Sequence, residues 1–340
     1  MNDEQPHDYL WDGTGPPDPD VAHLENLLRP LAHRGSPPAW PPRKRPGAYR
    51  VMAFARPALA IAAAALLAVS VWFGWGMWRG GWSVQTVTGM PVLDGVSMGE
   101  DGLLQRGGRL VTDGASRARI SVGRIGRVDV DPDTRLRLIN TGGRDHRLSL
   151  ERGTIHAQIS APPRFFFVDT PSAVAIDLGC AYTLQVDDAG AGLLRVTHGW
   201  VQFAFDGRTA FIPQGAVGAT RPGVGPGTPR YEDAPSGFAE ALAVLDFGEM
   251  NDPKRDRALA LILATSRRRD ALTLWHLLSR GSPGERQRVY DQLARLSPAP
   301  SEVTRDAVLA GDQRALNAWW DSFRFEGTSW WDRVKKKARS

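Results

Sequence analysis

Seven histidines are the residues best suited to acid–base or metal chemistry, and their spacing fits neither kind of site. No two of them form a His-Glu-x-x-His pattern, and no cysteine stands near enough in sequence to complete a paired metal motif. We therefore expect no metal centre and no cofactor. The histidines are His7, His23, His33, His146, His156, His198 and His276.

Cys180 is the only cysteine, which excludes an intramolecular disulfide and a zinc site built from cysteine pairs. The simplest interpretation is a buried free thiol. The alternative is a nucleophile paired with His198 or His156, although no motif supports it. Asp187 and Asp188 fall in a predicted turn, where carboxylates are solvated. Because no nucleophile elbow or phosphate-binding loop occurs either, we expect no catalytic residue and no enzymatic activity.

A long uncharged passage interrupts an otherwise globular composition of 340 residues, with 42% hydrophobic and 23% charged residues. Residues 57–78 carry no charged side chain and are long enough to cross a bilayer. Trp72, Trp75, Trp78 and Trp82 gather at the far end, as interfacial aromatic residues do. The passage begins too late for a cleaved signal peptide. We expect a transmembrane helix rather than a buried soluble helix.

The charges around this passage predict its orientation. Before Arg29 every charged residue is acidic, from Arg29 to Arg56 every one is basic, and after Arg79 no basic residue follows until Arg106. The positive flank favours the cytoplasmic side, so the N-terminus is expected inside and the bulk of the chain outside. Small residues at Ala58, Ala62, Ala65 and in the Gly76–Gly80 spacing would permit self-association of the helix.

Residues 1–35 form a short arm for which we expect one helix. Asp18 suits the N-cap, Pro19 suits the first helical position and Pro30 should end the helix. Its apolar residues recur at helical spacing, and so short an element cannot bury them by itself. We expect the arm to contact a partner or the membrane surface through this apolar stripe and Trp11, or otherwise to remain partly disordered. The apolar stripe consists of Val21, Leu24, Leu27, Leu28 and Leu31.

Residues 36–56 are a proline-rich, basic linker. The cluster Arg43, Lys44 and Arg45 fits a topology signal in contact with anionic lipid. No helix-turn-helix or aromatic-interleaved pattern accompanies the cluster, so direct nucleic-acid binding is not expected.

From residue 84 to 218, apolar and polar residues alternate in short runs separated by Gly, Pro, Asp and Asn. This pattern predicts an all-β sandwich or roll. Residues 187–192, "DDAGAG", are the clearest hairpin connection. Residues 219–236 are rich in Pro and Gly, and we interpret them as a second linker.

Residues 237–326 show helical periodicity. A helix should open at Pro253, and Ser282 with Glu285 forms a capping-box signature. Helical repeats and a plain bundle both fit this region, and Trp319 and Trp320 are expected in its core. Residues 327–340 form a basic tail that is either solvated or laid on the outer leaflet.

The order of the strand motifs resembles the FecR domain. A strand ending "LERG", then "IHAQI", "FFFVDTP", "AIDLGCAYTLQV" and "LRVTHGWVQF" follow one another between Arg109 and Phe205. The family commonly has Leu-Gly-Thr where this chain has Leu178, Gly179 and Cys180, a change that keeps a small side chain. Glycine is required where φ is positive or the backbone approaches closely, so three glycines are expected to be structural turn residues. They are Gly153, Gly179 and Gly199.

The resemblance implies a membrane-tethered regulator of an alternative sigma factor, of the anti-sigma type. It implies an inner-membrane protein with a periplasmic β domain that contacts an envelope protein and a cytoplasmic arm that contacts the sigma factor. The arm has His23 and His33 but no cysteine, so the zinc set of many such regulators is not implied. The alternative from the residues alone is a non-catalytic envelope scaffold that binds peptidoglycan, a polysaccharide or another envelope protein.

Overall fold

The computed structural model describes residues 19–31, which belong to a first unit, and residues 80–323, which belong to a second. In the first unit, α2 (Pro19–Leu28) is followed by the 3₁₀ turn η1 (Arg29–Leu31). The α-helix ends just before Pro30, as expected for a residue that cannot continue it. Within the described ranges no helix is long and apolar enough to cross a membrane. Trp11, the linker 36–56, the expected span 57–78 and the tail 327–340 lie outside these ranges.

The β domain consists of two sheets that share one long strand, β9 (Asp145–Ile159). All strand pairs are antiparallel except β9 with β10. The first sheet contains β4 (Asp101–Gln105), β1 (Gly81–Thr88), β6 (Arg117–Val122), β7 (Gly126–Val130), β12 (Ala181–Val186), β13 (Gly192–His198), β16 (Ala216–Arg221), β17 (Gly225–Pro226) and β18 (Arg230–Tyr231). The second contains β3 (Val96–Ser97), β2 (Val92–Leu93), β5 (Arg109–Val111), β8 (Arg135–Gly142), β10 (Phe166–Asp169), β11 (Val174–Asp177), β14 (Trp200–Phe205) and β15 (Arg208–Pro213).

Gly153 is where β9 passes from one sheet to the other. Residues 145–152 pair with β8, and residues 153–158 pair with β12. The φ of Gly153 is 99°, and a Cβ there would lie 2.4 Å from the Cα of Thr134. The requirement for glycine is therefore as expected, but the expected turn is wrong: the strand bends and continues.

The core lies between the two sheets, where alternate residues of each strand point inward. Leu136, Leu138, Leu148 and Leu150 from the second sheet are fully buried, as are their counterparts from the first, Val128, Ile155 and Leu184. Each such side chain contributes about 1.5–3 kcal/mol when removed from water. The expected β sandwich is confirmed.

The segment 219–236 is not a free linker, which corrects the sequence interpretation. Thr220 pairs with Pro226 and Val217 with Arg230, so β17 and β18 complete the edge of the first sheet. Residues 225–229 are buried. The Pro and Gly content marks turns between short strands rather than an absence of structure.

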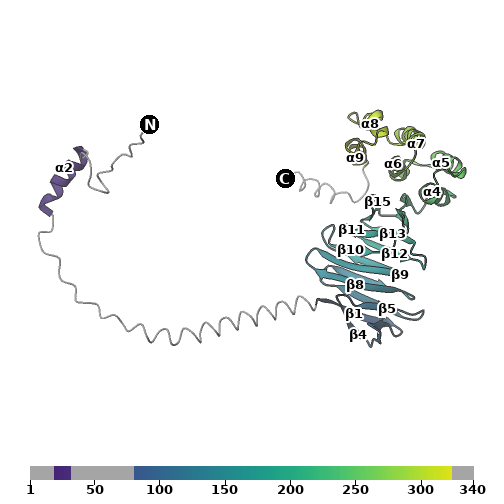
Figure 1. The fold of residues 1–340 in the computed structure, drawn as a ribbon, viewed down its shortest axis with the longest axis horizontal. Coiled ribbons are helices and arrows are strands. Elements are labelled where there is room, and N and C mark those ends of the chain that lie inside the picture. Colours follow the sequence, from purple (N-terminus) through teal and green to yellow (C-terminus); the bar gives the residue numbers. More distant parts are fainter. Residues whose placement is uncertain (1–18, 32–79, 324–340) are drawn as a thin grey trace. The chain divides into compact units, whose positions relative to one another are not determined.

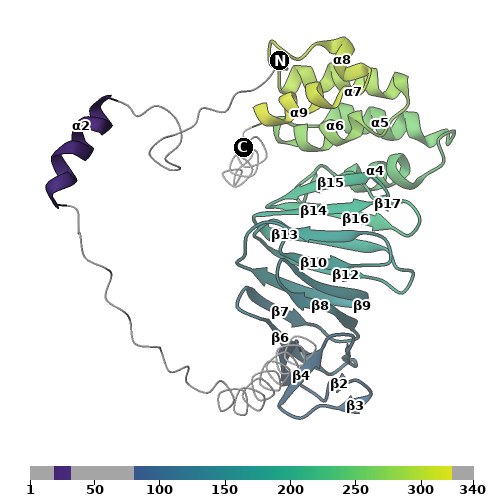
Figure 2. The same cartoon turned by 60° about the vertical axis from the view of Figure 1, so that its left-hand side comes forward.

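Helices follow the β domain, as expected. They are α4 (Phe238–Phe247), α5 (Lys254–Thr265), η2 (Arg268–Asp270), α6 (Ala271–Leu278), α7 (Pro283–Leu296), α8 (Arg305–Leu309) and α9 (Gln313–Ser322). The capping box at Ser282 and Glu285 is present, and Pro253 occupies the N-cap of α5. Figures 1 and 2 show the helices gathered at the β15 end of the sandwich.

Aromatic side chains join the helices to this end of the sandwich. The Trp320 ring of α9 lies 6.0 Å from Trp200, 5.7 Å from Phe211 and 4.6 Å from Trp275, measured between ring centroids. Trp319 is fully buried. Both tryptophans therefore belong to the core, as the sequence predicts.

Candidate functional site

The apolar stripe on α2 is exposed in the first unit. The exposed fractions are 55% for Leu24, 60% for Leu27, 57% for Leu28 and 79% for Leu31, whereas Val21 is half-buried. A run of large apolar side chains on one face of a helix is a typical binding surface, because covering it removes apolar area from water. Trp11, the other expected contact residue, lies outside the described part of the chain.

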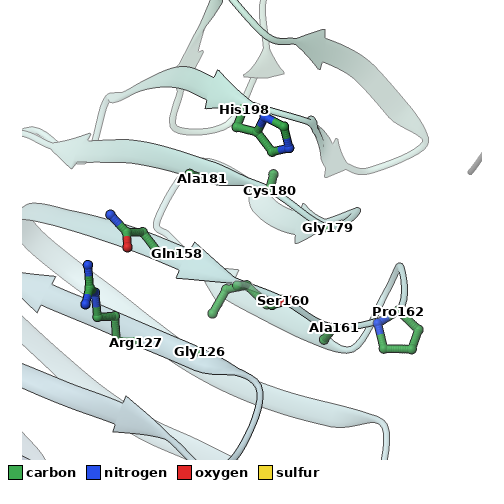
Figure 3. Close-up of a pocket in the computed structure, with 11 residues that line it drawn as sticks. Gly126, Arg127, Gln158, Ser160, Ala161, Pro162, Gly179, Cys180, Ala181 and His198 are labelled. Carbon is green, nitrogen blue, oxygen red and sulfur yellow. The ribbon is translucent and has the colours of Figure 1, made fainter. Parts of the chain in front are cut away.

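A second candidate site is an open groove of about 850 Å³ across one end of the first sheet (Figure 3). The groove has four exposed polar side chains: Arg127 from β7, Gln158 from β9, Ser160 just after β9 and His198 from β13. Gly179 and Cys180 line the groove where the chain enters β12. The strand order brings residues that are about 70 positions apart in sequence to one surface.

The turn beside this groove is held by Asp177. Its Oδ1 accepts a hydrogen bond from the Gly179 N–H at 2.7 Å, and its Oδ2 accepts one from the Cys180 thiol at 2.7 Å. Gly179 has a φ of 91° and Gly199 a φ of 73°. A Cβ on Gly199 would lie 2.3 Å from the carbonyl oxygen of Gly179, so the two turns pack backbone to backbone. Gly179 and Gly199 are the structural turn residues that the sequence predicts.

Burial controls the electrostatics of this turn. It raises the pKa of Asp177 to about 7, against the hydrogen bonds from Cys180 and Gly179. Burial also raises the pKa of Cys180, and the neighbouring carboxyl of Asp177 adds to the effect. Burial likewise raises the pKa of Tyr182, whose hydroxyl has no hydrogen-bond partner within residues 80–323.

The alternative interpretation of Cys180 as a nucleophile is not supported. A raised thiol pKa disfavours the reactive thiolate, and the thiol donates to Asp177 rather than to a histidine. His156 instead lies between Thr183 and Asp131, at 2.9 Å from Nδ1 and 2.8 Å from Nε2.

The other candidates from the sequence lie in structural positions. Asp187 Oδ1 accepts from the backbone of the predicted hairpin, and Asp188 forms an exposed ion pair with Arg152 at 2.9 Å. In the described ranges, no three or more His, Cys, Asp or Glu residues are arranged to hold a metal ion.

Residues 108–202 match the family described as FecR protein. Two crystal structures of a candidate anti-sigma factor from Parabacteroides distasonis ATCC 8503 are similar at 14% identity and a TM-score of 0.33, over 39% of this chain. The chain spans 63% and 62% of the length of those two chains. A comparison with curated proteins finds no match. The expected resemblance to the FecR domain is confirmed for residues 108–202.

Proposed function

We propose that this chain, which carries a FecR domain, is a single-pass regulator of the bacterial inner membrane that relays an envelope signal to a cytoplasmic sigma factor. The FecR domain receives the signal through contact with an envelope protein in the periplasm. The helix α2 holds or releases the sigma factor. The protein acts by protein–protein contact, without a cofactor, without catalysis and without direct nucleic-acid binding.

The exposure of the apolar stripe is the observation that carries this proposal. Leu24, Leu27 and Leu28 are each more than half exposed on a ten-residue helix. A partner that covers them gains roughly 25 cal/mol for each square ångström of apolar surface removed from water. An amphipathic helix laid in an apolar groove is a common recognition mode.

Photo-crosslinking in living cells tests the contact. A crosslinking amino acid at Leu24 of the full-length protein should capture a sigma factor. The matched control is Asn26, an exposed residue of the same helix. At 100° per residue it lies on the opposite face from the apolar stripe, and we expect little capture there. Capture of no sigma factor from Leu24, or equal capture from both positions, would contradict the proposal.

The membrane orientation rests on the uncharged passage 57–78 and its basic flank. An alkaline phosphatase fused after Ser340 should be active, since that enzyme needs the periplasm, and one fused after Arg50 should not. The reverse pattern, or release of the protein from membranes at alkaline pH, would overturn this orientation. Self-association through the passage would appear as crosslinked dimers in the same membranes.

A cell-envelope scaffold is the second candidate, and the groove in Figure 3 favours it. Its volume and its exposed Arg127, Gln158 and His198 suit a hydroxyl-rich glycan or an extended peptide. Sedimentation with purified peptidoglycan distinguishes the two functions. Binding that is lost in Gln158→Ala, with no sigma factor crosslinked through α2, would favour the scaffold.

A further inference from the structure

A network of buried charges joins the β domain to the helices. Asp246 of α4 accepts from Arg208 of β15 at 3.1 Å and from Arg280 at 3.2 Å. The N–H and the hydroxyl of Thr228 also donate to Asp246, at 2.6 and 2.8 Å. Arg280 further donates to the carbonyl of Thr209 at 2.9 Å. One carboxylate therefore holds two arginines from different parts of the fold.

This network carries an excess of positive charge. The side chains of Arg280 and Asp246 are only 8% and 2% exposed. Burial lowers the pKa of Arg280 to about 10, with a further contribution from Arg208, so Arg280 stays protonated at neutral pH. His276 adds no charge to the network, since burial lowers its pKa to about 3 and leaves it neutral at neutral pH. Arg255 is matched by Glu285 at 3.0 Å. Two arginines thus share the single negative charge of Asp246.

A cavity of about 520 Å³ opens beside these arginines. It lies between β15 and the helices α4, α6 and α9, and Arg208, Arg280, Trp275 and Gln313 are among its lining residues. Arg208 is the network arginine that reaches toward solvent, with 26% of its side chain exposed. Its Nε is buried and has no hydrogen-bond partner among the described residues. A buried donor without an acceptor is unfavourable, so the protein alone does not satisfy all the hydrogen bonds of the Arg208 guanidinium.

We propose that this cavity binds a small oxyanion, the carboxylate or phosphate group of a metabolite, through Arg208 and Arg280. An arginine fork matches the two oxygens of such a group, and the anion supplies the negative charge that the network lacks. Because β15 and the helices both line the cavity, the bound anion would link the β domain to the helices. The site is separate from the apolar stripe on α2, so this inference does not depend on the sigma-factor proposal.

Isothermal titration of the purified full-length protein with inorganic phosphate, and separately with acetate, tests the proposal at constant ionic strength against chloride. We expect saturable binding of at least one anion, and which anion binds identifies the chemistry. Arg208→Gln should weaken it about tenfold or more, as expected for loss of a charged hydrogen bond. Arg195→Gln is the control, since Arg195 is 53% exposed, pairs with Glu232 and does not line the cavity.

Gln313→Glu provides a second variant that leaves the buried network intact. Gln313 is exposed and is the first residue of α9, where a carboxylate suits the helix dipole, so the variant should fold. Its negative charge at the cavity should repel the anion and weaken binding severalfold. The proposal fails if neither anion binds the wild-type protein saturably. It also fails if Gln313→Glu and a folded Arg208→Gln bind as tightly as Arg195→Gln.

Discussion

The backbone N–H of Phe211 in β15 donates a hydrogen bond to Nε2 of His276 in α6, at 3.1 Å. The other ring nitrogen, Nδ1, lies 2.8 Å from the carbonyl of Leu272 and therefore donates. Since one nitrogen accepts and the other donates, His276 is held as the neutral tautomer. β15 lies at an edge of its sheet, where it pairs with β14, and the histidine accepts a hydrogen bond from an amide of this edge strand.

His276 should make the stability of the second unit depend on acid pH. The pKa of His276 is about 3 in the folded state against an ordinary 6.5. Between pH 6.5 and pH 3 this histidine is therefore protonated in the unfolded chain and neutral in the folded chain. Stability should fall by up to about 1.4 kcal/mol per pH unit between pH 6.5 and pH 3. His276→Gln keeps an acceptor for Phe211 but cannot titrate. Urea unfolding at several pH values should show a shallower slope for this variant, and an unchanged slope would contradict the assignment.

Asp177 should make the stability of the folded protein depend on pH in the opposite direction to His276. Its pKa is about 7 in the folded state against an ordinary 3.8, so between these values the folded protein binds the extra proton. Stability should therefore decrease as pH rises from about 4 to 7. Asp177→Asn retains an oxygen for the Gly179 N–H and removes the ionisation. The variant should gain stability relative to wild type across that range, by up to about 1.4 kcal/mol per pH unit. If the difference in the free energy of unfolding between the variant and the wild type did not change with pH, Asp177 would not titrate as a buried carboxyl.

Alanine substitutions at Gly199 and Gly215 distinguish the cost of a steric clash from the cost of a strained backbone conformation. Their φ angles are nearly equal, at 73° and 75°. A Cβ at Gly199 would meet the Gly179 carbonyl at 2.3 Å, whereas one at Gly215 would meet nothing within 4 Å. Gly215→Ala should cost about 1 kcal/mol from the left-handed conformation alone. Gly199→Ala should cost about 3 kcal/mol or more, because the turn at Gly179 must also move. Equal losses in chemical denaturation would mean that the two turns are not packed together.

Asp246 should be far more important for stability than a surface carboxylate. Asp246→Asn leaves the buried Arg280 and the half-buried Arg208 without a countercharge, and we expect a loss of about 3 kcal/mol. The control is Asp188→Asn, which breaks an ion pair whose carboxylate is 85% exposed and should have little effect. Thermal unfolding of the two variants compares them directly. A small loss in Asp246→Asn would show that the network does not hold the helices to the sandwich.

Local signals in the sequence were sufficient for much of the fold. Alternation predicts the sandwich, and the Ser282 capping box and the "DDAGAG" turn are both where the residues indicate. The bend at Gly153 is different, because alternation continues through it and only the partner strands change. The edge strands β17 and β18 exist because β16 offers them a partner, which no local composition shows.

The candidate sites likewise include features that the local sequence predicts and features that only the folded structure brings together. The apolar stripe on α2 and the positive φ of Gly179 and Gly199 follow from local spacing and residue type. The network of Asp246 with Arg208 and Arg280 joins residues 34 and 38 positions apart in sequence, and no motif marks it. Only the folded arrangement of β15 against the helices brings these charges together.

The most direct test of the central claim is recovery of the full-length protein from detergent-solubilised membranes, with its bound partners identified by mass spectrometry. The wild-type protein should carry a sigma factor, and Leu24→Asp with Leu28→Asp should lose most of it because two charges interrupt the apolar stripe. Asn26→Asp, which adds one charge to the opposite face, should retain the sigma factor. A sigma factor absent from the wild-type sample, or equally abundant in all three samples, would contradict the account.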